Sequence, residues 1–578
     1  MHKLAIITFL LIISIFNFSD SDATQFGIPP KTPNLAASEG NVYLIWKDNV
    51  SEKYETLVTT STDNGFSFTR PIVLGKSSDS ISQIRALGEN VYVVGVETTP
   101  NSSDVFFARS TDSGITFDHV ISLSGKIGRS HSPQLVISGG NVYVTWVMNL
   151  FGNDEVVVRT SKDNGTTFGA TIDVSKSRGI SDHPRMAVSG SNVYVVWQES
   201  GKGNFDIGFS VSTNSGDSFR IMSLSDKEVD SFFPTIAAYA NNVYITWEDR
   251  LGENFDVSFR ASRDNGVTFD PAIRLDTDEL LSDIPEVVAF GDNVYVMWRA
   301  GSINGTEVLF RKSNDNGITF DEIKRLSETY GPSQIAIYEN NVYLVWENRV
   351  SNNNEIFWAT STDGGNTFRI TKVSETTGDS VSAQIAIDGE NVYVVWTDYT
   401  FSRKYGEVFF ARSTNEGLHF ENPIIISNTI TSPNDSGQTN MEQFTISSVL
   451  DRKNYTIAGK SFDVAASSFE IYPNWGIEIR LMTRNGGVLE LTLPRDIIDE
   501  IRVVNASIED YTVALGFQEV SADPSSRTIR FIVPADTYDV EIKGAKVVPE
   551  FPISLIILAT CFAVLITLRK SIIIRWPN

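Results

Sequence analysis

The sequence predicts an all-β protein: a β-propeller of eight four-stranded blades, followed by a small β-sandwich and a single C-terminal transmembrane helix. Two short motifs recur eight times at a spacing of about 50 residues, which is typical of one propeller blade. After residue 430 these repeats stop and other short β-type segments begin. The chain then finishes on an apolar segment followed by basic residues.

The N-terminal segment has the composition of a secretory signal. Lys3 precedes an apolar run that ends near Phe18, and the polar stretch SDSDAT follows. This order is typical of a signal peptide that is removed during export. We therefore predict a signal over residues 1–25 and export of the rest of the chain.

The repeats predict the ring. The first motif, NVY followed by an apolar run, has its first copy at Asn41 and its eighth at Asn391. The second motif, SxDxGxxF, follows each copy at nearly constant spacing. NVY segments such as NVYLIW are apolar at successive positions, which indicates a strand covered on both faces. Four-stranded sheets buried on both faces and repeated at this spacing are typical of propeller blades.

The predicted ring spans residues 31–430. No leftover strand is evident at either end, so the eighth blade is expected to pack flat on the first without strand exchange. A ring of seven blades with one unit outside it is the alternative.

Composition limits the class of partner. The chain has 578 residues, a formal net charge of -24 and a single cysteine, Cys561. Nucleic-acid binding requires a basic surface, so this charge excludes nucleic acid and favours cationic partners or divalent metal. One cysteine permits no disulfide within the chain.

The region after the ring is predicted to hold a linker and a second domain. Residues 431–440 are polar, and residues 441–546 have the pattern of short strands at the spacing of a small β-sandwich. We expect this sandwich to form a stalk. Asn-x-Ser/Thr triplets, including those at Asn49 and Asn304, are consistent with a glycosylated exterior.

The C-terminal apolar segment predicts a membrane anchor over residues 551–570. Arg569 and Lys570 follow the apolar run and predict a cytoplasmic C-terminus, with the bulk of the chain outside the cell. The preceding VPEFP resembles the C-terminal anchoring signal of archaeal surface proteins that carry a proline-glutamate-phenylalanine motif. That resemblance implies a tail that is cut and exchanged for a lipid; otherwise the helix remains as the anchor.

The SxDxGxxF segment, here called the box turn, resembles the Asp box, or BNR repeat, of the sialidase superfamily in all eight units. Serine and aspartate side chains hold a tight turn through nearby backbone groups, and glycine supplies a positive φ. Two copies carry asparagine, which keeps the hydrogen bonding without the charge, so we interpret the position as structural. Its residues are Asp63, Asp112, Asp163, Asn214, Asp264, Asp315, Asp363 and Asn415.

The resemblance places the box turns opposite the active face and directs attention to the loops at the other end of the blades. Sialidases use three arginines, a tyrosine–glutamate pair and an aspartate. In this sequence Gly27 of FGIPP stands where the first arginine is expected, and sialidase rings have six blades. We therefore assign no catalytic residue.

The loops opposite the box turns still supply candidate binding residues. Charged residues end the second strands, as in WQES and WEDR: Asp48, Glu199, Glu248, Asp249, Arg250, Glu347, Arg349 and Asp398. In the second blade, Gly95 replaces the tryptophan of the other seven units and is followed by Glu97. The missing indole predicts either a ligand notch beside Glu97 or simple drift of one blade.

The first strands and their approach loops supply further candidates. A polar residue recurs at one first-strand position and includes Arg185 and Glu286; these side chains are expected to line the channel and bind ligand or solvent. His131 and His183 fall in adjacent loops, where they either ligate a metal or lie exposed.

An acid opens every third strand, six residues before the box serine, from Glu55 in the first blade to Glu407 in the eighth. We expect it to form a repeated structural bond, for instance to a backbone N–H of the neighbouring blade. Divalent cation binding, with Ca2+ as the candidate, is the alternative.

Together these features predict a surface-anchored propeller that binds a glycan or another surface protein without catalysis. An exo-glycoside hydrolase of sialidase type is the alternative from a different class. A structural spacer of the cell envelope is a third hypothesis.

Overall fold

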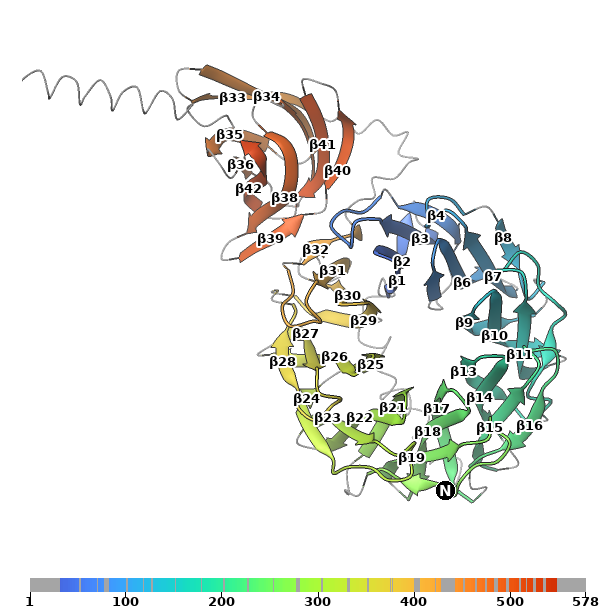
Figure 1. The fold of residues 1–578 in the computed structure, drawn as a ribbon. Helices are drawn as coiled ribbons and strands as arrows, with labels where there is room; N and C mark the ends of the chain where they lie inside the picture. The colour runs from blue at the N-terminus through green and yellow to red at the C-terminus, as the bar shows by residue number, and fades with distance from the viewer. Residues whose placement is uncertain are drawn as a thin grey trace, which may run out of the picture. The chain divides into compact units, whose positions relative to one another are not determined.

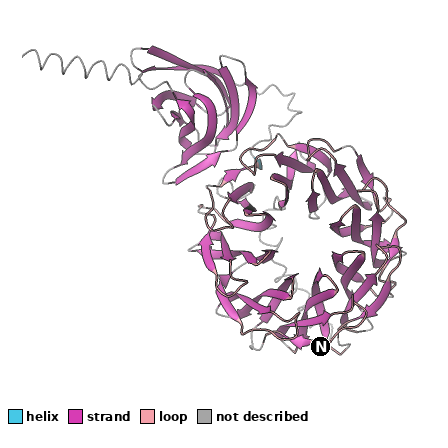
Figure 2. Cartoon of the chain, in the orientation of Figure 1, coloured by secondary structure: helices cyan, strands magenta, loops and turns pink. Residues whose placement is uncertain are grey.

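The computed structural model of the protein is built from β-strands (Figure 2). It describes residues 32–427 and 442–547 with short gaps, which are 51–52, 70, 77–82, 100–101, 118, 126–127, 151, 178, 201–202, 226–227, 253, 277–280, 303–304, 330–332, 351–352, 375, 377, 400–405, 422, 451–452, 463–464, 473–475, 483–486, 495–497, 509–510, 516, 523–525 and 534–536. The predicted signal (1–25), linker (431–440) and anchor (551–570) lie outside this part. Within it, no helix is long and apolar enough to span a bilayer.

Strands β1 to β32 form eight antiparallel sheets of four consecutive strands each. Figure 1 shows the sheets following one another around a ring, with the first strand of each blade innermost. Blades 1 to 4 comprise β1 (Asn34–Ser38), β2 (Asn41–Val50), β3 (Lys53–Ser61), β4 (Ile72–Lys76); β5 (Gln83–Leu87), β6 (Asn90–Thr99), β7 (Ser102–Ser110), β8 (His119–Ser122); β9 (Ser130–Ser138), β10 (Asn141–Leu150), β11 (Asn153–Ser161), β12 (Ile172–Asp173); and β13 (Ser181–Ser189), β14 (Asn192–Ser200), β15 (Phe205–Ser212), β16 (Arg220–Ser223). Blades 5 to 8 comprise β17 (Asp230–Tyr239), β18 (Asn242–Leu251), β19 (Asn254–Ser262), β20 (Ile273–Arg274); β21 (Leu281–Phe290), β22 (Asn293–Ser302), β23 (Gly305–Ser313), β24 (Lys324–Thr329); β25 (Ser333–Tyr338), β26 (Asn341–Val350), β27 (Asn353–Ser361), β28 (Arg369–Lys372); and β29 (Ser380–Asp388), β30 (Asn391–Asp398), β31 (Glu407–Ser413), β32 (Ile424–Ile425).

The NVY segments form the second strands, and their side chains enter two different cores. In β10, Val142 and Val144 pack with Tyr92 of the preceding blade, whereas Tyr143 packs with Val193 of the following blade. All are at most 1% exposed. Because each face of the sheet meets a neighbouring blade, the strand is apolar at successive positions instead of alternating.

The same packing closes the ring. Leu44 and Trp46 of blade 1 share a core with Tyr393 and Phe410 of blade 8. Each of the eight sheets consists of consecutive strands, so the seam contains no exchanged strand among residues 32–427, as far as these are described. The prediction of an eight-bladed propeller is confirmed, and the seven-bladed alternative does not apply.

A side chain of the neighbouring strand replaces the tryptophan that blade 2 lacks. Gly95 of β6 lies directly opposite Phe106 of β7. Phe106 is 3% exposed and packs in the core between blades 1 and 2. The phenyl ring therefore supplies apolar volume to the core where the predicted notch beside Glu97 would open.

The box turn repeats one hydrogen-bond pattern. In blade 1, Ser61 Oγ donates to Asp63 Oδ1 (2.6 Å) and accepts the N–H of Gly65 (2.8 Å), while the Asp63 carboxylate accepts the N–H and hydroxyl of Ser67. Asn64 and Gly65 adopt positive φ (57° and 79°). The pattern explains why serine, aspartate and glycine recur together.

The asparagine copies keep this geometry without the charge. In blade 4, Asn214 Oδ1 accepts from Ser212 Oγ (2.8 Å) and from the N–H of Ser218 (3.1 Å). In blade 3, by contrast, hydrogen bonds from Thr167 and Ser161 lower the pKa of Asp163 to about 2, so its carboxylate is charged at neutral pH. The turn accepts either residue because the bonds, not the charge, define it.

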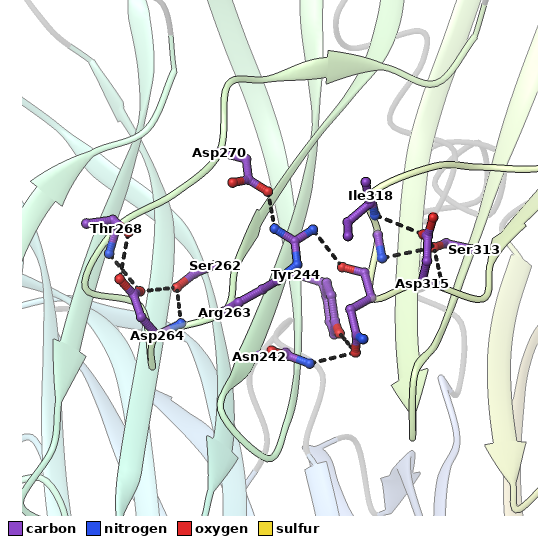
Figure 3. A network of polar contacts seen from close by, with 12 residues as sticks. Asn242, Tyr244, Ser262, Arg263, Asp264, Thr268, Asp270, Ser313, Asp315 and Ile318 are labelled. Carbon is purple, nitrogen blue, oxygen red and sulfur yellow. Dashed lines mark hydrogen bonds and ion pairs between the residues drawn. The ribbon is translucent and has the colours of Figure 1, made fainter.

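Each box turn is also bonded by the preceding blade. Figure 3 shows Arg263 of blade 5 beside Asp270 and the next box turn; its Nη2 donates to the carbonyl of Asn316 (3.0 Å), and Asn242 Nδ2 donates to Asn316 Oδ1 (2.7 Å). A side-chain donor crosses all eight seams to the next box turn: Thr60, Arg109, Lys162, Arg220, Arg263, Lys312, Trp358 and Arg412. We call this end of the ring, with the turns between first and second strands, the box face.

The chain divides into two compact units, residues 1–432 and 433–578. The second unit has two five-stranded antiparallel sheets, ordered β39-β38-β42-β36-β35 and β33-β34-β37-β41-β40. Alternate side chains such as Leu489, Leu491 and Leu493 are fully buried, as expected when each sheet of a sandwich buries one face. The strands are β33 (Glu442–Leu450), β34 (Lys453–Phe462), β35 (Ala465–Tyr472), β36 (Gly476–Met482), β37 (Gly487–Pro494), β38 (Ile498–Ile508), β39 (Tyr511–Leu515), β40 (Phe517–Ala522), β41 (Ser526–Val533) and β42 (Thr537–Val547).

Candidate ligand-binding face

The loop face, opposite the box face, carries the turns between second and third strands and the connections from each blade to the next. A bulge interrupts the first strand near this face in blades 3, 4, 5, 6 and 8. Each bulge contains a non-glycine residue with positive φ, namely Ser132, His183, Phe233, Ile284 and Ser382. Such a conformation is strained, above all for β-branched Ile284, and bulges often re-aim side chains beside functional sites.

In three blades the bulge N–H is bonded to the preceding blade. Gln198, Glu248 and Glu347 accept the N–H groups of Phe233 (3.4 Å), Ile284 (2.7 Å) and Ser382 (2.6 Å), respectively. Each acceptor is the residue directly after the second-strand tryptophan. Two predicted site residues, Glu248 and Glu347, therefore take equivalent places in blades 5 and 7.

Blade 6 places an arginine at the same position, between the two glutamates. Arg299 is 5% exposed, and its Nε and Nη2 donate to the two carboxylate oxygens of Asp283 at 2.7 and 2.5 Å. Its charge also acts on Glu248 and Glu347. We call Glu248, Asp283, Arg299 and Glu347 the charged cluster.

Burial changes the protonation of the two glutamates. Desolvation, followed by the charge of Asp283, raises the pKa of Glu248 well above its usual range. Desolvation raises the pKa of Glu347 to about 8, although the Ser382 N–H and Arg299 act in the opposite direction. Glu347 is therefore predominantly protonated at neutral pH.

A second group lies at the same end of blades 3 and 4. Asp182 has one carboxylate oxygen 3.8 Å from His131 Nδ1 and the other 3.4 Å from His183 Nδ1. The His183 ring packs edge-on against Phe233 at 4.9 Å, and burial lowers its pKa. The two predicted histidines therefore meet at one carboxylate.

The recurring polar residues of the first strands bond one another. Gln83 Nε2 donates to Gln134 Oε1 (3.0 Å), and Asn34 Nδ2 donates to Gln384 Oε1 across the closing seam (3.4 Å). Burial raises the pKa of Glu286, and the charge of Arg185 opposes this shift. The amide members link neighbouring first strands, whereas Arg185 and Glu286 place opposite charges in the same series.

Three predicted acids are bonded to their own blade. Glu199, Asp249 and Asp398 accept the indole N–H of the tryptophan two residues earlier, at 3.1, 2.7 and 3.4 Å. Asp398 is fully buried and also accepts from Ser380 Oγ. These bonds support the blade and leave the three side chains outside the charged cluster.

The remaining candidates lie apart from the charged cluster. Asp48 and Glu97 lie across the sheet from the acids that open their third strands, Glu55 and Asp104. Arg250 Nη1 lies 4.0 Å from Asp230. Arg349 is exposed near the end of β26.

The third-strand acids form a repeated structural bond, as expected, but within their own blade and not to a backbone N–H of the neighbouring blade. Glu155 accepts from Ser175 Oγ (2.5 Å), and Ser175 Oγ accepts the N–H of Val156. The same acid–serine pair occurs between Asp104 and Ser124 and between Glu355 and Ser374. Because this pair holds the segment after the fourth strand to the third strand, it explains the regular spacing of the acids.

No group of three or more histidine, cysteine, aspartate or glutamate side chains is placed to hold a metal ion within the part of the chain that the structure describes. Sequence reasoning missed Arg299 and Asp283. The signal was present in the repeats: the residue after the second-strand tryptophan, or after Gly95 in blade 2, is in turn Lys47, Val96, Val147, Gln198, Glu248, Arg299, Glu347 and Thr397.

No family model and no curated protein matches the chain. Solved structures do match the chain, at low sequence identity. An ulvan lyase of polysaccharide lyase family PL25, solved with -[GlcA(1-4)Rha3S]-, is 12% identical, with coverage of 64% of this chain and 92% of the lyase and a TM-score of 0.39. A leech intramolecular trans-sialidase is 11% identical (66% and 90% coverage, TM-score 0.34), and a prolyl endopeptidase is 10% identical (65% and 53%, TM-score 0.40). These similarities are too distant to assign a ligand or an activity to this chain.

Proposed function

We propose that the protein is an exported, membrane-anchored propeller that binds a glycan or another surface protein at its loop face without catalysis. The observation that carries this proposal is the charged cluster. Glu248, Arg299 and Glu347 occupy one position on three consecutive blades, and all are at most 5% exposed.

The fold itself does not require charge at this position. Blades 2 and 3 carry Val96 and Val147 there, and both side chains are buried. Burying ionisable groups is unfavourable, and strongly shifted pKa values concentrate at functional sites. A cluster of such groups beside strained bulges therefore supports a ligand site near the inner ends of blades 5 to 7.

The second candidate is an exo-glycoside hydrolase. Glu347 favours it, since a carboxylic acid with a pKa of about 8 keeps the proton that a general acid must donate to a leaving group. Glu347 is already bonded by the Ser382 N–H, and Arg299 forms a two-bond ion pair with Asp283. These fixed contacts favour the binding function.

A glycan array probed with the full-length protein in mild detergent, with and without calcium, tests the proposal. We expect binding that falls at least about tenfold in the Asp283→Val/Arg299→Val double variant and persists in Asp63→Asn, a matched change on the box face. Binding unaffected by the double variant would contradict the proposed location. Release of fluorophore from a sialoside or another exo-glycosidase substrate, lost in Glu347→Gln, would establish the enzyme instead.

A further inference from the structure

The turns between first and second strands differ between blades at one position on the box face. Four blades carry a polar residue there: Ser38, Ser138, Ser189 and Asp388. Blade 2 carries Leu87. The three consecutive blades 5, 6 and 7 instead carry the aromatic residues Tyr239, Phe290 and Tyr338.

The polar residues at this position link neighbouring blades. Ser189 Oγ donates to the carbonyl of Ala240 (2.8 Å), Ser38 Oγ accepts the N–H of Gly88 (3.0 Å), and Asp388 Oδ2 accepts the N–H of Gly40 (2.6 Å). Phe290 has no polar atom with which to form such a link. At the position of Phe290, blade 6 therefore lacks the side-chain hydrogen bond to the next blade.

The aromatic rings are accessible. Tyr239, Phe290 and Tyr338 are 36%, 40% and 40% exposed, and the rings of Tyr239 and Phe290 lie 5.3 Å apart at 60°. Val267 and Ile318, in the box turns of blades 5 and 6, add exposed apolar surface. Exposed apolar side chains also occur on the box face of blades 1 and 2, at Phe66, Leu87 and Ile115, but exposed aromatic rings at the hairpin position occur in blades 5, 6 and 7. A group of accessible rings of this kind indicates an interaction surface.

Each aromatic residue is accompanied by a polar one. Two residues further along the same turns stand Asn241, Asp292 and Asn340, and all three are exposed. The three turns, on hairpins β17–β18, β21–β22 and β25–β26, follow one another around the ring (Figure 1). The box face therefore repeats one unit on three adjacent blades, an aromatic residue followed two positions later by an exposed amide or carboxylate. The Asp292 carboxylate also accepts a hydrogen bond from Asn316 Nδ2 (3.2 Å).

We propose that these three turns form a binding site for a neutral polysaccharide chain. A pyranose ring has an apolar C–H face that packs on an aromatic ring, and hydroxyl groups that bond amide and carboxylate oxygens. A repeated binding unit suits a polymer with repeated sugars, because each further contact forms at high effective concentration. Asp292 and the net charge of -24 disfavour a polyanion. This site lies on the opposite end of the blades from the charged cluster and does not depend on it.

Co-sedimentation with insoluble cellulose, mannan and chitin tests this proposal, using the full-length protein in a sugar-free detergent. The test variant is Tyr239→Ser/Phe290→Ser/Tyr338→Ser, since serine occupies this position in three other blades. We expect the natural protein to bind at least one of the three polymers. The triple serine variant should bind at least about tenfold more weakly, with an unchanged circular dichroism spectrum.

Two control variants distinguish the aromatic rings from the tyrosine hydroxyls and from the loop face. Tyr239→Phe/Tyr338→Phe keeps the rings and should retain binding within about twofold, and Asp283→Val/Arg299→Val on the loop face should bind as the natural protein does. The proposal is overturned if the natural protein binds none of the polymers, if the serine variant binds equally well, or if the loop-face variant loses as much. Self-association that depends on the three rings, without polysaccharide binding, would identify a protein interface instead and also overturn it.

Discussion

On the box face, all eight blades repeat one hydrogen-bonded turn and receive a donor from the preceding blade. On the loop face, the residue after the second-strand tryptophan, or after Gly95 in blade 2, is valine in two blades and a buried charged residue in four, three of them consecutive. The same strands connect both faces. The two faces nevertheless place different demands on the sequence.

The difference follows from what each bond does. A box turn uses positive φ and an internal serine–aspartate bond, so few other residues fit, and the neighbouring blade depends on its carbonyl groups. At the loop face, the position after tryptophan accepts an N–H only where the next blade has a bulge. The residue at this position can therefore differ between blades while the blade still folds. In blades 5 to 7 it is an ionisable residue.

The strongest test of this contrast removes charge from the loop face. Arg299→Val leaves Asp283 without its ion-pair partner, so we expect the unfolding free energy to fall by about 4 kcal/mol. The double variant Asp283→Val/Arg299→Val should recover most of this loss, because Val147 and Val381 occupy the equivalent positions in other blades. Urea unfolding followed by tryptophan fluorescence measures both. Equal losses in the two variants would show that the charged cluster belongs to the fold.

The next test uses pH. Because the pKa of Glu347 is raised to about 8 in the folded protein, unfolding releases a proton between about pH 4.5 and 8, and stability falls as pH rises through that window. Glu347→Gln can still accept the Ser382 N–H and does not titrate. At pH 7 the variant should be more stable than the natural protein by about 3 kcal/mol, as measured by melting temperature across pH. Parallel curves for the two proteins would contradict the shifted pKa.

The smallest effect is expected at the box face. Asp63→Ala removes the acceptor for Ser61 and Ser67 and should lower the unfolding free energy by about 1 kcal/mol, since the site is solvent-exposed. Asp63→Asn should change it less, because Asn214 forms the same bonds in blade 4. Chemical denaturation of the two variants side by side measures the difference. If asparagine were as damaging as alanine, the turn would require the charge.

Periodicity made the ring predictable from the sequence. Successive buried positions in the NVY segments and the recurring glycine of the box turns depend on local geometry, which repeats in the sequence as it does in space. The bulges left a weaker signal, a proline directly after the positive-φ residue in blades 3 to 6, since proline within a sheet is found mainly at edges and bulges. His183 and Ile284 themselves are neither glycine nor asparagine, the residues that would indicate positive φ. Their conformation depends on tertiary contacts with the neighbouring blade.

The candidate site was only partly predictable for the same reason. Glu248 and Glu347 stood out as acids after tryptophan, but so did Glu199, Asp249 and Asp398, whose carboxylates bond the indole of their own strand. One residue along the strand decides between these outcomes, since adjacent side chains point to opposite faces of the sheet. Arg299 was not predicted because its strand ends in WRAGS, without the acid that marked the other candidate strands.

The seam between blades 8 and 1 contains the same kind of core as the other seams, and no strand in the described part of the chain crosses it. The ring therefore does not require any particular blade to come first in the sequence. A circular permutant that joins residues 427 and 32 through a linker and opens the chain between any other two blades would keep all eight sheets intact. The packing of the ring is therefore compatible with chain ends between any two blades.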